Sequence, residues 1–270
     1  MNTNLIFFDV DGTIITEDDY IPPSTVAAIQ AAQQAGSLCI VNTGRPYSHI
    51  FPAVREIGFS GYICSCGQQI LLQNQTIFHT GFSTAESAQI VSLVRACGLD
   101  AVFEAEAGVW FLFSQDPCPQ ILDGMRHFEA LGFNTAKSVD APDFCFDKFC
   151  VWSNPASDVP RFLQNIRPLC QTIFRENHLI ELVKKGYSKQ TGIQFLMERL
   201  EASPDQCYAI GDSANDIPMF QCVPHSIAMG DAPDAVKRTV SYVTAPLRED
   251  GLAKALEHFG LVSKPVHTQP

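Results

Sequence analysis

Two aspartates at the end of an apolar stretch are the residues of this chain best placed to do chemistry. Asp9 and Asp11 follow the apolar residues that begin at Leu5, and Gly12 and Thr13 come next. Side chains two residues apart on a strand project to the same side, so both carboxylates are expected to share one site. Close carboxylates repel each other, and a divalent cation is one way to make the pair tolerable. The motif therefore indicates a candidate metal site.

Other interpretations of this pair remain open. The pattern Asp-x-Asp-Gly resembles part of a calcium-binding loop, but the first ligand position would be Phe7, and a strand rather than a helix precedes it. Two carboxylates also suit glycoside hydrolysis, although that reaction needs them on opposite sides of a sugar. An ordinary capped strand end would need only one Asp.

A second polar cluster follows a later apolar strand. Asp212 comes directly after Gly211, and Asn215 and Asp216 are expected in the first turn of the next helix. An Asp at a helix N-cap, with an acid near the positive end of the helix dipole, would explain one of these acids. It does not explain the matching pair at the first strand.

Two further segments could bind an anion. Thr43, Gly44 and Arg45 offer a hydroxyl and backbone N–H groups at an expected helix start, which is a ready anion site. A Thr that merely caps the helix is the alternative, and the same amides can serve both roles. Lys189 also lies at an expected helix start, where a cation is unfavourable, so it either serves the site or is one of many solvated lysines.

Alternating strands and helices predict the frame that positions these residues. Expected strands at 5–10 and 38–42 alternate with helices, and the alternation resumes at 188 and continues to 259. This order predicts an α/β fold with a doubly wound, Rossmann-like parallel sheet. Ligands bind at the carboxyl ends of the strands in such sheets, and the first three polar segments all follow strand ends. The tail from 263 is expected to be disordered.

The middle of the chain has a different pattern of expected strands and helices. A short strand pattern at 109–113 lies among helical patterns at 85–96 and 121–130, with prolines between and after them. We predict a catalytic core made of residues 1–81 and 184–270, with an α+β domain inserted at 82–183.

Composition argues against several classes of function. The formal net charge is −11 and the isoelectric point about 5.0, which disfavours binding to nucleic acid or anionic lipid. No run reaches the roughly 18 apolar residues of a membrane-spanning helix, and no secretory signal is expected. The ten cysteines lack zinc-site spacing and do not look like a disulfide framework, which indicates a reduced, cytoplasmic chain. A monomer or weak homodimer that meets a small anionic substrate is the default expectation.

Taken in order, the motifs resemble those of the haloacid dehalogenase-like (HAD) superfamily. Asp-x-Asp-Gly-Thr, Thr-Gly-Arg, Lys and Gly-Asp-x-x-Asn-Asp follow one another over nearly the whole chain, and the likeness is greatest to Cof-type phosphatases of subfamily IIB. The resemblance implies a Mg²⁺-dependent phosphatase that hydrolyses a small phosphorylated metabolite, such as a sugar phosphate or a phosphorylated cofactor. The inserted domain resembles the α/β cap that closes over the core and selects the substrate.

The same resemblance implies a role for each motif residue. Asp9 would be the nucleophile that becomes an aspartyl-phosphate, and Asp11 would protonate the leaving oxygen and then deprotonate the attacking water. Mg²⁺ would be held by Asp9, the backbone carbonyl of Asp11 and Asp212. The phosphoryl group would be bound by Thr43, Gly44, Lys189 and Asn215. Asp216 and Arg45 would support these residues from a second layer, and Asp216 could also reach the metal through water.

The chain departs from the family's pattern in three places. Relatives usually carry Asn-Gly-Ala where this chain has Cys66-Gly67-Gln68, Gly-Asn-Ala where it has Gly230-Asp231-Ala232, and Pro where it has Lys184-Lys185. None of these departures is expected to touch the four motifs, but they leave the substrate undetermined. Candidate residues of the inserted domain that could face it are Glu104, Trp110, Asp116 and Lys148.

Two alternatives to the phosphatase stay open. A phosphomutase of the same subfamily would return the phosphoryl group from Asp9 to a substrate hydroxyl. A catalytically silent binding protein could share the fold, since fold alone does not determine function. The presence of Asp9, Asp11, Lys189 and Asp212 together argues against the silent protein.

Overall fold

The computed structural model describes residues 3–175 and 178–262, which form two compact units. The first unit contains the residues up to 45, 50–78 and those from 188 onward, and the second contains 46–49 and 79–187. The sequence predicted divisions at 81/82 and 183/184, a few residues from those observed. It did not predict that the four residues after Arg45 group with the second unit. The tail from 263 lies outside the described residues.

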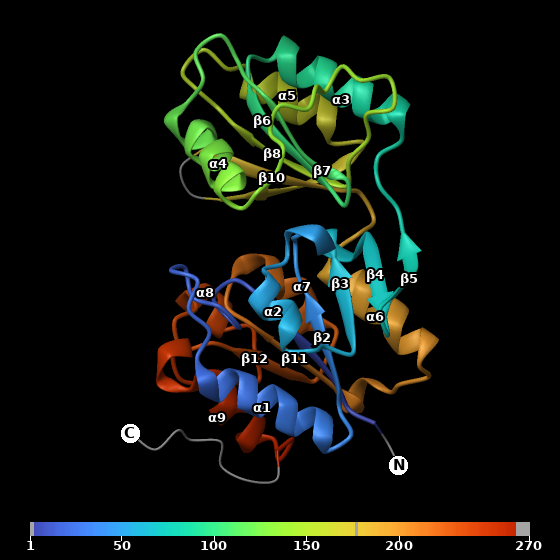
Figure 1. Ribbon diagram of the computed structural model, residues 1–270, viewed down its shortest axis with the longest axis vertical. Coiled ribbons are helices and arrows are strands. Elements are labelled where there is room, and N and C mark those ends of the chain that lie inside the picture. The colour runs from blue at the N-terminus through green and yellow to red at the C-terminus, as the bar shows by residue number, and fades with distance from the viewer. Residues whose placement is uncertain (1–2, 176–177, 263–270) are drawn as a thin grey trace. The chain divides into compact units, whose positions relative to one another are not determined.

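An eight-stranded sheet organises the first unit (Figure 1). Its order is β13-β12-β11-β1-β2-β3-β4-β5, and all pairs from β13 to β3 are parallel, while β4 runs antiparallel to β3. The chain leaves β1 on one side towards β2 and later returns on the other side to β11, which makes the ends of these strands a topological switch point. The predicted doubly wound, Rossmann-like sheet is confirmed. The elements of this unit are β1 (Leu5–Phe8), α1 (Pro23–Gln34), β2 (Leu38–Asn42), α2 (Pro52–Glu56), β3 (Gly61–Cys64), β4 (Gln69–Leu72), β5 (Gln75–His79), α6 (Lys189–Arg199), β11 (Cys207–Gly211), α7 (Ile217–Gln221), β12 (His225–Ala228), α8 (Asp234–Lys237), β13 (Tyr242–Val243) and α9 (Gly251–His258).

Strand β1 is buried on both faces, which explains its unbroken run of apolar residues. Phe7 packs in one cluster with Ile193 of α6 and Met219 of α7. Ile6 and Phe8 point to the opposite face and are also fully buried. A parallel strand covered on both sides has this pattern, and the chain can turn polar only where the strand ends.

A five-stranded antiparallel sheet organises the second unit. Its order is β7-β6-β8-β10-β9, and α3 and α5 pack on one face through apolar side chains such as Ile90 and Phe162. On the other face α4 packs through Ile121 against Val102 and Phe111. The elements are α3 (Thr84–Ala96), β6 (Asp100–Ala105), β7 (Gly108–Leu112), α4 (Pro119–Ala130), β8 (Lys148–Trp152), α5 (Val159–Ile166), β9 (Cys170–Phe174) and β10 (Leu179–Lys184).

The segment after Arg45 differs from its prediction. A helix was expected to start here, but the chain forms a 3₁₀ turn at Tyr47–His49 and begins α2 only at Pro52. Proline lacks a backbone N–H and disfavours the helical conformation in the residue before it, so Pro46 and Pro52 break the helical pattern at both ends of this segment.

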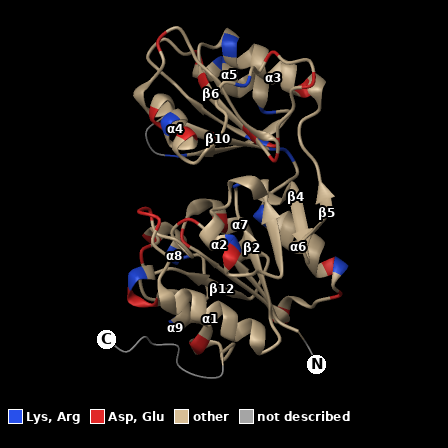
Figure 2. Cartoon of the chain, viewed as in Figure 1, with Lys and Arg blue, Asp and Glu red and all other residues tan. Residues whose placement is uncertain are grey.

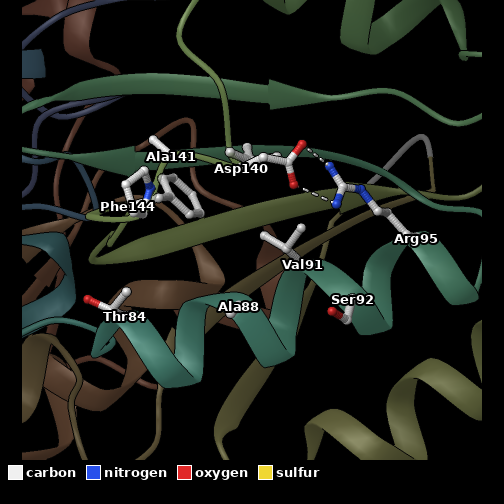
Figure 3. Close-up of a pocket in the computed structure, with 10 residues that line it drawn as sticks. Thr84, Ala88, Val91, Ser92, Arg95, Asp140, Ala141 and Phe144 are labelled. Atoms are coloured by element: carbon white, nitrogen blue, oxygen red, sulfur yellow. Dashed lines mark hydrogen bonds and ion pairs between the residues drawn. The ribbon is translucent and has the colours of Figure 1, made fainter.

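Charged residues of both signs are scattered over each unit (Figure 2). In the second unit, Arg95 of α3 donates two hydrogen bonds to the Asp140 carboxylate, at 2.8 and 2.7 Å (Figure 3). Both residues line a surface hollow with Thr84 and Phe144. Because both side chains are largely exposed, this pair is a surface feature that solvent screens. None of the described helices combines the length and the hydropathy needed to cross a bilayer.

Candidate active site

Asp9 leaves the sheet at the carboxyl end of β1. Its backbone N–H donates to the carbonyl of Ile210 in the neighbouring strand β11, at 2.9 Å, so the strand pairing holds it in place. The residue is 4% exposed. A buried carboxylate at this edge requires compensating charge or hydrogen bonds.

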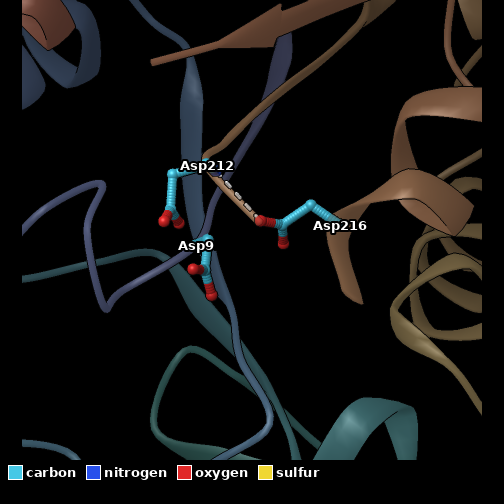
Figure 4. A group of neighbouring side chains, drawn as sticks. All are labelled: Asp9, Asp212 and Asp216. Carbon is cyan, nitrogen blue, oxygen red and sulfur yellow. Dashed lines mark hydrogen bonds between the residues drawn. The ribbon is translucent and has the colours of Figure 1, made fainter. Parts of the chain in front are cut away.

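Two further carboxylates lie around Asp9 (Figure 4). One ammonium group also contacts it. Asp212 follows β11 directly, and Asp216 ends the 3₁₀ turn Ala214–Asp216. One oxygen of each of the three carboxylates lies within 4.8 Å of the others. The Lys189 ammonium, 1% exposed, lies 2.5 Å from Asp9 Oδ1 and 2.6 Å from Asp216 Oδ1. The structure thus brings together four of the predicted site residues.

Backbone contacts hold this cluster in place. The second oxygen of Asp216 accepts from the N–H groups of Asp212, at 3.0 Å, and Ser213, at 2.9 Å. Lys189 begins α6, and its carbonyl accepts from the side-chain amide of Asn42 at the end of β2, at 3.1 Å. Asn42 was not among the predicted residues, although a polar side chain at the end of an apolar strand is the signal by which Asp9 was found.

Burial and mutual repulsion shape the electrostatics. Burial and the negative charges of Asp216 and Asp212 raise the pKa of Asp9, while Lys189 acts in the opposite direction. Burial, followed by the charge of Asp216, raises the pKa of Asp212 to about 6. Burial disfavours the charged form of Lys189, but Asp216 and Asp9 outweigh it and raise its pKa. One ammonium therefore does not balance three carboxylates.

Asp11 lies apart from this cluster. Its side chain is 53% exposed and accepts from Arg45 Nε at 2.9 Å and from Nη2 at 2.8 Å. Arg45 also lies over the ring of Phe51, with 4.6 Å from its central carbon to the ring centroid. The prediction that both aspartates share one site is therefore met only in part, because Asp11 pairs with Arg45 rather than with the other carboxylates. A two-point guanidinium contact of this kind fixes the orientation of the carboxylate.

Thr43 is buried at the end of β2, next to β1, but the predicted helix start is wrong. Its N–H donates to the carbonyl of Ile63, and its hydroxyl oxygen accepts from the N–H of Arg45 at 3.2 Å. Two of the amides expected to bind an anion are thus already engaged. The Thr43 hydroxyl hydrogen can still serve as a donor, and Gly44 lies in the same turn.

Asn215 lies between Asp212 and Asp216 in the 3₁₀ turn. Its side-chain oxygen accepts from the Ser213 hydroxyl at 2.6 Å, so its amide nitrogen is the end able to donate to a ligand. On the β1 side, the Thr13 hydroxyl donates to Asp212 Oδ1 at 3.4 Å. Thr13 belonged to the quoted motif but had been given no role.

One departure from the family pattern does touch the motifs, contrary to expectation. The N–H of Cys66 donates to the carbonyl of Thr43 at 3.1 Å, and the N–H of Ser65 donates to that of Arg45 at 2.9 Å. A Cβ on Gly67, whose φ is +89°, would lie 2.4 Å from the carbonyl oxygen of Ser188. The turn that carries Cys66-Gly67-Gln68 therefore holds Thr43 in place through backbone hydrogen bonds. These two segments are distant in sequence, and the fold brings them together.

The four candidate residues of the second unit lie in three different places. Glu104 and Lys148 are buried and form an ion pair at 3.4 Å. Trp110 belongs to the apolar cluster on the opposite face of the sheet, where the Lys137 ammonium lies 4.9 Å from the centroid of its ring. Asp116 is exposed, and its carbonyl accepts from Asn154.

Comparison with known proteins gives consistent matches. A family model described as haloacid dehalogenase-like hydrolase matches residues 6–256. The chain is 28% identical over 97% of its length to the whole of YkrA from Bacillus subtilis, whose name assigns it provisionally to the phosphatases. It is 24% identical to the 5-amino-6-(5-phospho-D-ribitylamino)uracil phosphatase YitU of the same organism, over 95% of this chain and 98% of that one. The solved structure of the HAD subclass IIB sugar phosphatase BT4131 has a TM-score of 0.81 and 26% identity, covering 96% of this chain and 100% of that one.

Proposed function

The chain belongs to the haloacid dehalogenase-like hydrolase family, and from this premise we propose that it works with Mg²⁺ and through an aspartyl-phosphate on Asp9. The resemblance to Cof-type phosphatases of subfamily IIB is confirmed, and the chain is a phosphoric monoester hydrolase that acts on small phosphorylated substrates. The metal, the intermediate and the roles of individual residues are the parts that we propose. The observation that carries them is the buried contact of Lys189 with Asp9 and Asp216 beside Asp212.

The donor set fits a hard divalent cation. Asp9 and Asp212 offer carboxylate oxygens, which Mg²⁺ prefers. Burial first, and then neighbouring negative charge, raises the pKa of each carboxyl, and a cation would offset both effects. Asp216 has both oxygens engaged by Lys189 and backbone N–H groups, so it is better suited to hold the cluster in place than to bind metal directly. Asp9, Asp212 and the Asp11 carbonyl would hold Mg²⁺, which supplies charge neutralisation to the phosphoryl group.

The proposed reaction has two steps. In the first, the Asp9 oxygen that is not bonded to Lys189 attacks phosphorus, the ester P–O bond breaks, and Asp11 gives a proton to the leaving oxygen. In the second, Asp11 takes a proton from water, the water oxygen attacks phosphorus, and the bond to Asp9 breaks, which releases phosphate. Arg45 donates two hydrogen bonds to the Asp11 carboxylate, so the acid role requires Asp11 to separate from Arg45.

The remaining residues bind the phosphoryl group in this proposal. Thr43 and Asn215 each retain a donor, and Lys189 carries a positive charge at the nucleophile. Neutralising charge in a buried site is the main requirement of phosphoryl transfer, so these donors supply what the reaction needs.

The nature of the substrate is part of the proposal. One relative is named for a phosphorylated ribityl compound and another for sugar phosphates, which supports a phosphorylated metabolite of sugar type. We propose that the second unit selects among such compounds, as a cap domain. A cytoplasmic location is also proposed, because the ten cysteines are free thiols.

The test is phosphate release from a panel of sugar phosphates and phosphorylated cofactors, with Mg²⁺ and with a chelator. Asp9→Asn should abolish release while leaving the thermal unfolding midpoint close to that of the wild type. Asp123→Asn, which changes an exposed carboxylate in α4, serves as the matched control and should keep full activity.

Three outcomes would change the proposal. Substantial turnover by the Asp9→Asn variant would remove Asp9 as the nucleophile. Equal rates with metal and with chelator would remove Mg²⁺. Conversion of a hexose phosphate to an isomer without release of phosphate would identify a phosphomutase.

A further inference from the structure

The four residues that follow the Thr-Gly-Arg motif belong to the second unit. The chain enters this unit after Arg45 and leaves it before Ile50, far in sequence from the links at 78/79 and 187/188. Pro46–His49 is therefore a short separate part of the second unit, and it begins directly after the turn assigned to phosphate binding. We call this segment the strap.

The strap is held inside the second unit at two points. His49, 4% exposed, places its Nδ1 atom 3.1 Å from Glu104 Oε2 of β6. Its ring packs edge-on against Phe128 of α4 and Phe133, with centroid distances of 5.4 and 4.5 Å. The backbone N–H of Ser48 donates to the carboxylate of Glu106 at 3.2 Å. Both carboxylates come from β6 and the turn that follows it.

The first anchor is itself held by a chain of alternating charges. Lys148 lies 3.4 Å from Glu104 and 3.0 Å from Glu181, and Arg175 lies 2.9 Å from the other oxygen of Glu181. Glu104, Lys148 and Glu181 are all buried on the sheet. A carboxylate oxygen accepts hydrogen bonds, so the contact forms when His49 donates from its Nδ1 atom.

The strap has little conformational freedom. Proline fixes φ at Pro46, and the N–H of His49 donates to the Pro46 carbonyl at 2.9 Å, which closes a 3₁₀ turn. Arg45 precedes it directly, and its carbonyl and guanidinium are both engaged, by Ser65 and Asp11. A short, hydrogen-bonded peptide transmits the position of one end to the other, so the anchors at Ser48 and His49 restrict the turn at 43–45.

We propose that the strap positions the phosphate-binding turn, with His49 as its main positioning residue and Ser48 as the second anchor. The inference rests on the proposed function, because it assigns phosphate binding to this turn. With the anchors released, the turn spends less time in its binding conformation. The apparent phosphate affinity then falls in proportion to the fraction of molecules that keep this conformation. The second unit thus contributes to phosphate affinity without supplying a ligand to the phosphate.

The test uses a variant with both anchors removed, His49→Phe with Glu106→Ala. Phenylalanine keeps an aromatic ring between Phe128 and Phe133, and Glu106 is exposed, so both changes preserve packing. Glu106→Ala alone is the milder variant if the double variant does not fold. The matched control is Asp140→Ala, which removes another exposed carboxylate of the same unit, away from the strap.

Two readouts are measured in the full chain with Mg²⁺. Hydrogen exchange followed by mass spectrometry should show the peptide spanning 43–50 exchanging about tenfold faster, with β8 and β10 unchanged. The dissociation constant of inorganic phosphate, from titration calorimetry, should rise about three- to tenfold in the same variant. The Asp140→Ala control should change neither readout.

Unchanged exchange at 43–50 would overturn the anchoring, and unchanged phosphate affinity in a variant that does exchange faster would overturn the positioning role. A structural defect of the whole unit would accelerate exchange in β8 and β10 as well, which would also contradict the proposal. Failure of the wild type to bind phosphate at all would instead contradict the proposed function, and the exchange readout would still test the anchors.

Discussion

Lys189 occupies an environment that its chemistry disfavours unless partners are supplied. It is the first residue of α6, where the helix dipole opposes a cation, and its side chain is fully removed from water. Contacts with Asp9 and Asp216 supply the missing stabilisation and raise the pKa of the ammonium. From the sequence pattern alone, a solvated lysine was the favoured alternative, and burial against two carboxylates excludes it.

Gly12 provides a prediction at the same scale. Its φ is +82°, and a Cβ at this position would lie 2.4 Å from Asp212 Oδ2. We expect Gly12→Ala to lose roughly 1–2 kcal/mol of stability from backbone strain and, in addition, about 100-fold in phosphate release, because the added methyl displaces Asp212. Thermal unfolding and steady-state kinetics measure the two effects.

Gly36 offers the matched control. Its φ is +93°, but no atom lies within 4 Å of the corresponding Cβ, so Gly36→Ala introduces the strain without the clash. It should lose similar stability and keep its activity. Equal losses of activity in both variants would mean that strain, and not displacement of Asp212, is responsible.

At the scale of elements, the strands of the second unit carry charge where a sheet normally carries apolar groups. Glu104 of β6 pairs in register with Lys148 of β8. Glu181 of β10 lies opposite Cys150, which is two residues from Lys148 and on the same face of β8. Burial acts to raise the pKa of Glu181, but Lys148 and Arg175 outweigh it and lower the pKa to about 2. Pairing therefore makes this buried carboxylate a stabilising group, whereas removal of one partner would leave a buried charge uncompensated.

This shift predicts how the second unit responds to acid. The pKa of Glu181 is lowered from its ordinary value of 4.5 to about 2, so its ionised form contributes about 3 kcal/mol to the free energy of unfolding. This contribution is fully present above pH 4.5 and is lost as the pH falls towards 2. Glu181→Gln should therefore be less stable than the wild type at neutral pH, and the difference should shrink between pH 4.5 and 2.

Both tryptophans, Trp110 and Trp152, lie in the second unit, so denaturant unfolding followed by their fluorescence reports on it directly. Asp140→Asn, which alters an exposed pair of the same unit, should show no comparable loss at neutral pH. A Glu181→Gln difference that stays constant over this pH range would contradict the assigned ionisation.

At the scale of the whole molecule, negative charge is concentrated where the proposed chemistry needs a cation. The net charge is −11, and three carboxylates share one strand-end cluster with a single ammonium. Residues that follow β1 and β11 meet the first residue of α6 there, although they lie up to 207 positions apart, as in the pair Asp9 and Asp216 (216 minus 9). Folding therefore brings repelling groups together, and the proposed divalent cation would relieve that repulsion in the native state only.

Mg²⁺ should accordingly stabilise the native chain. A ligand that binds only the folded state adds about 2.7 kcal/mol at a concentration 100 times its dissociation constant, which raises the thermal midpoint by several degrees. Asp212→Asn should lose most of this increase, while Asp123→Asn should keep it. Differential scanning calorimetry with and without Mg²⁺ measures it without any substrate, and an equal increase in both variants would place the ion elsewhere.

The amino-acid sequence by itself determined the alternation of strands and helices, the doubly wound sheet of the first unit and the identity of the polar strand ends. These depend on local patterns, since an apolar strand followed by an acid is readable without its neighbours. It also identified Asp9, Lys189, Asp212 and Asp216 as candidates for one site, and the structure brings them together.

Only the tertiary structure decided which of these groups touch and which do not. Asp11 pairs with Arg45 instead of joining the carboxylates, Cys66 supports Thr43, and His49 lies in the second unit. Each of these contacts joins segments that are distant along the chain or depends on a break in a helix, so no periodicity in the sequence encodes it. Their geometry follows from how the strands pack and from where prolines interrupt a helical pattern, and it decides which charges are compensated.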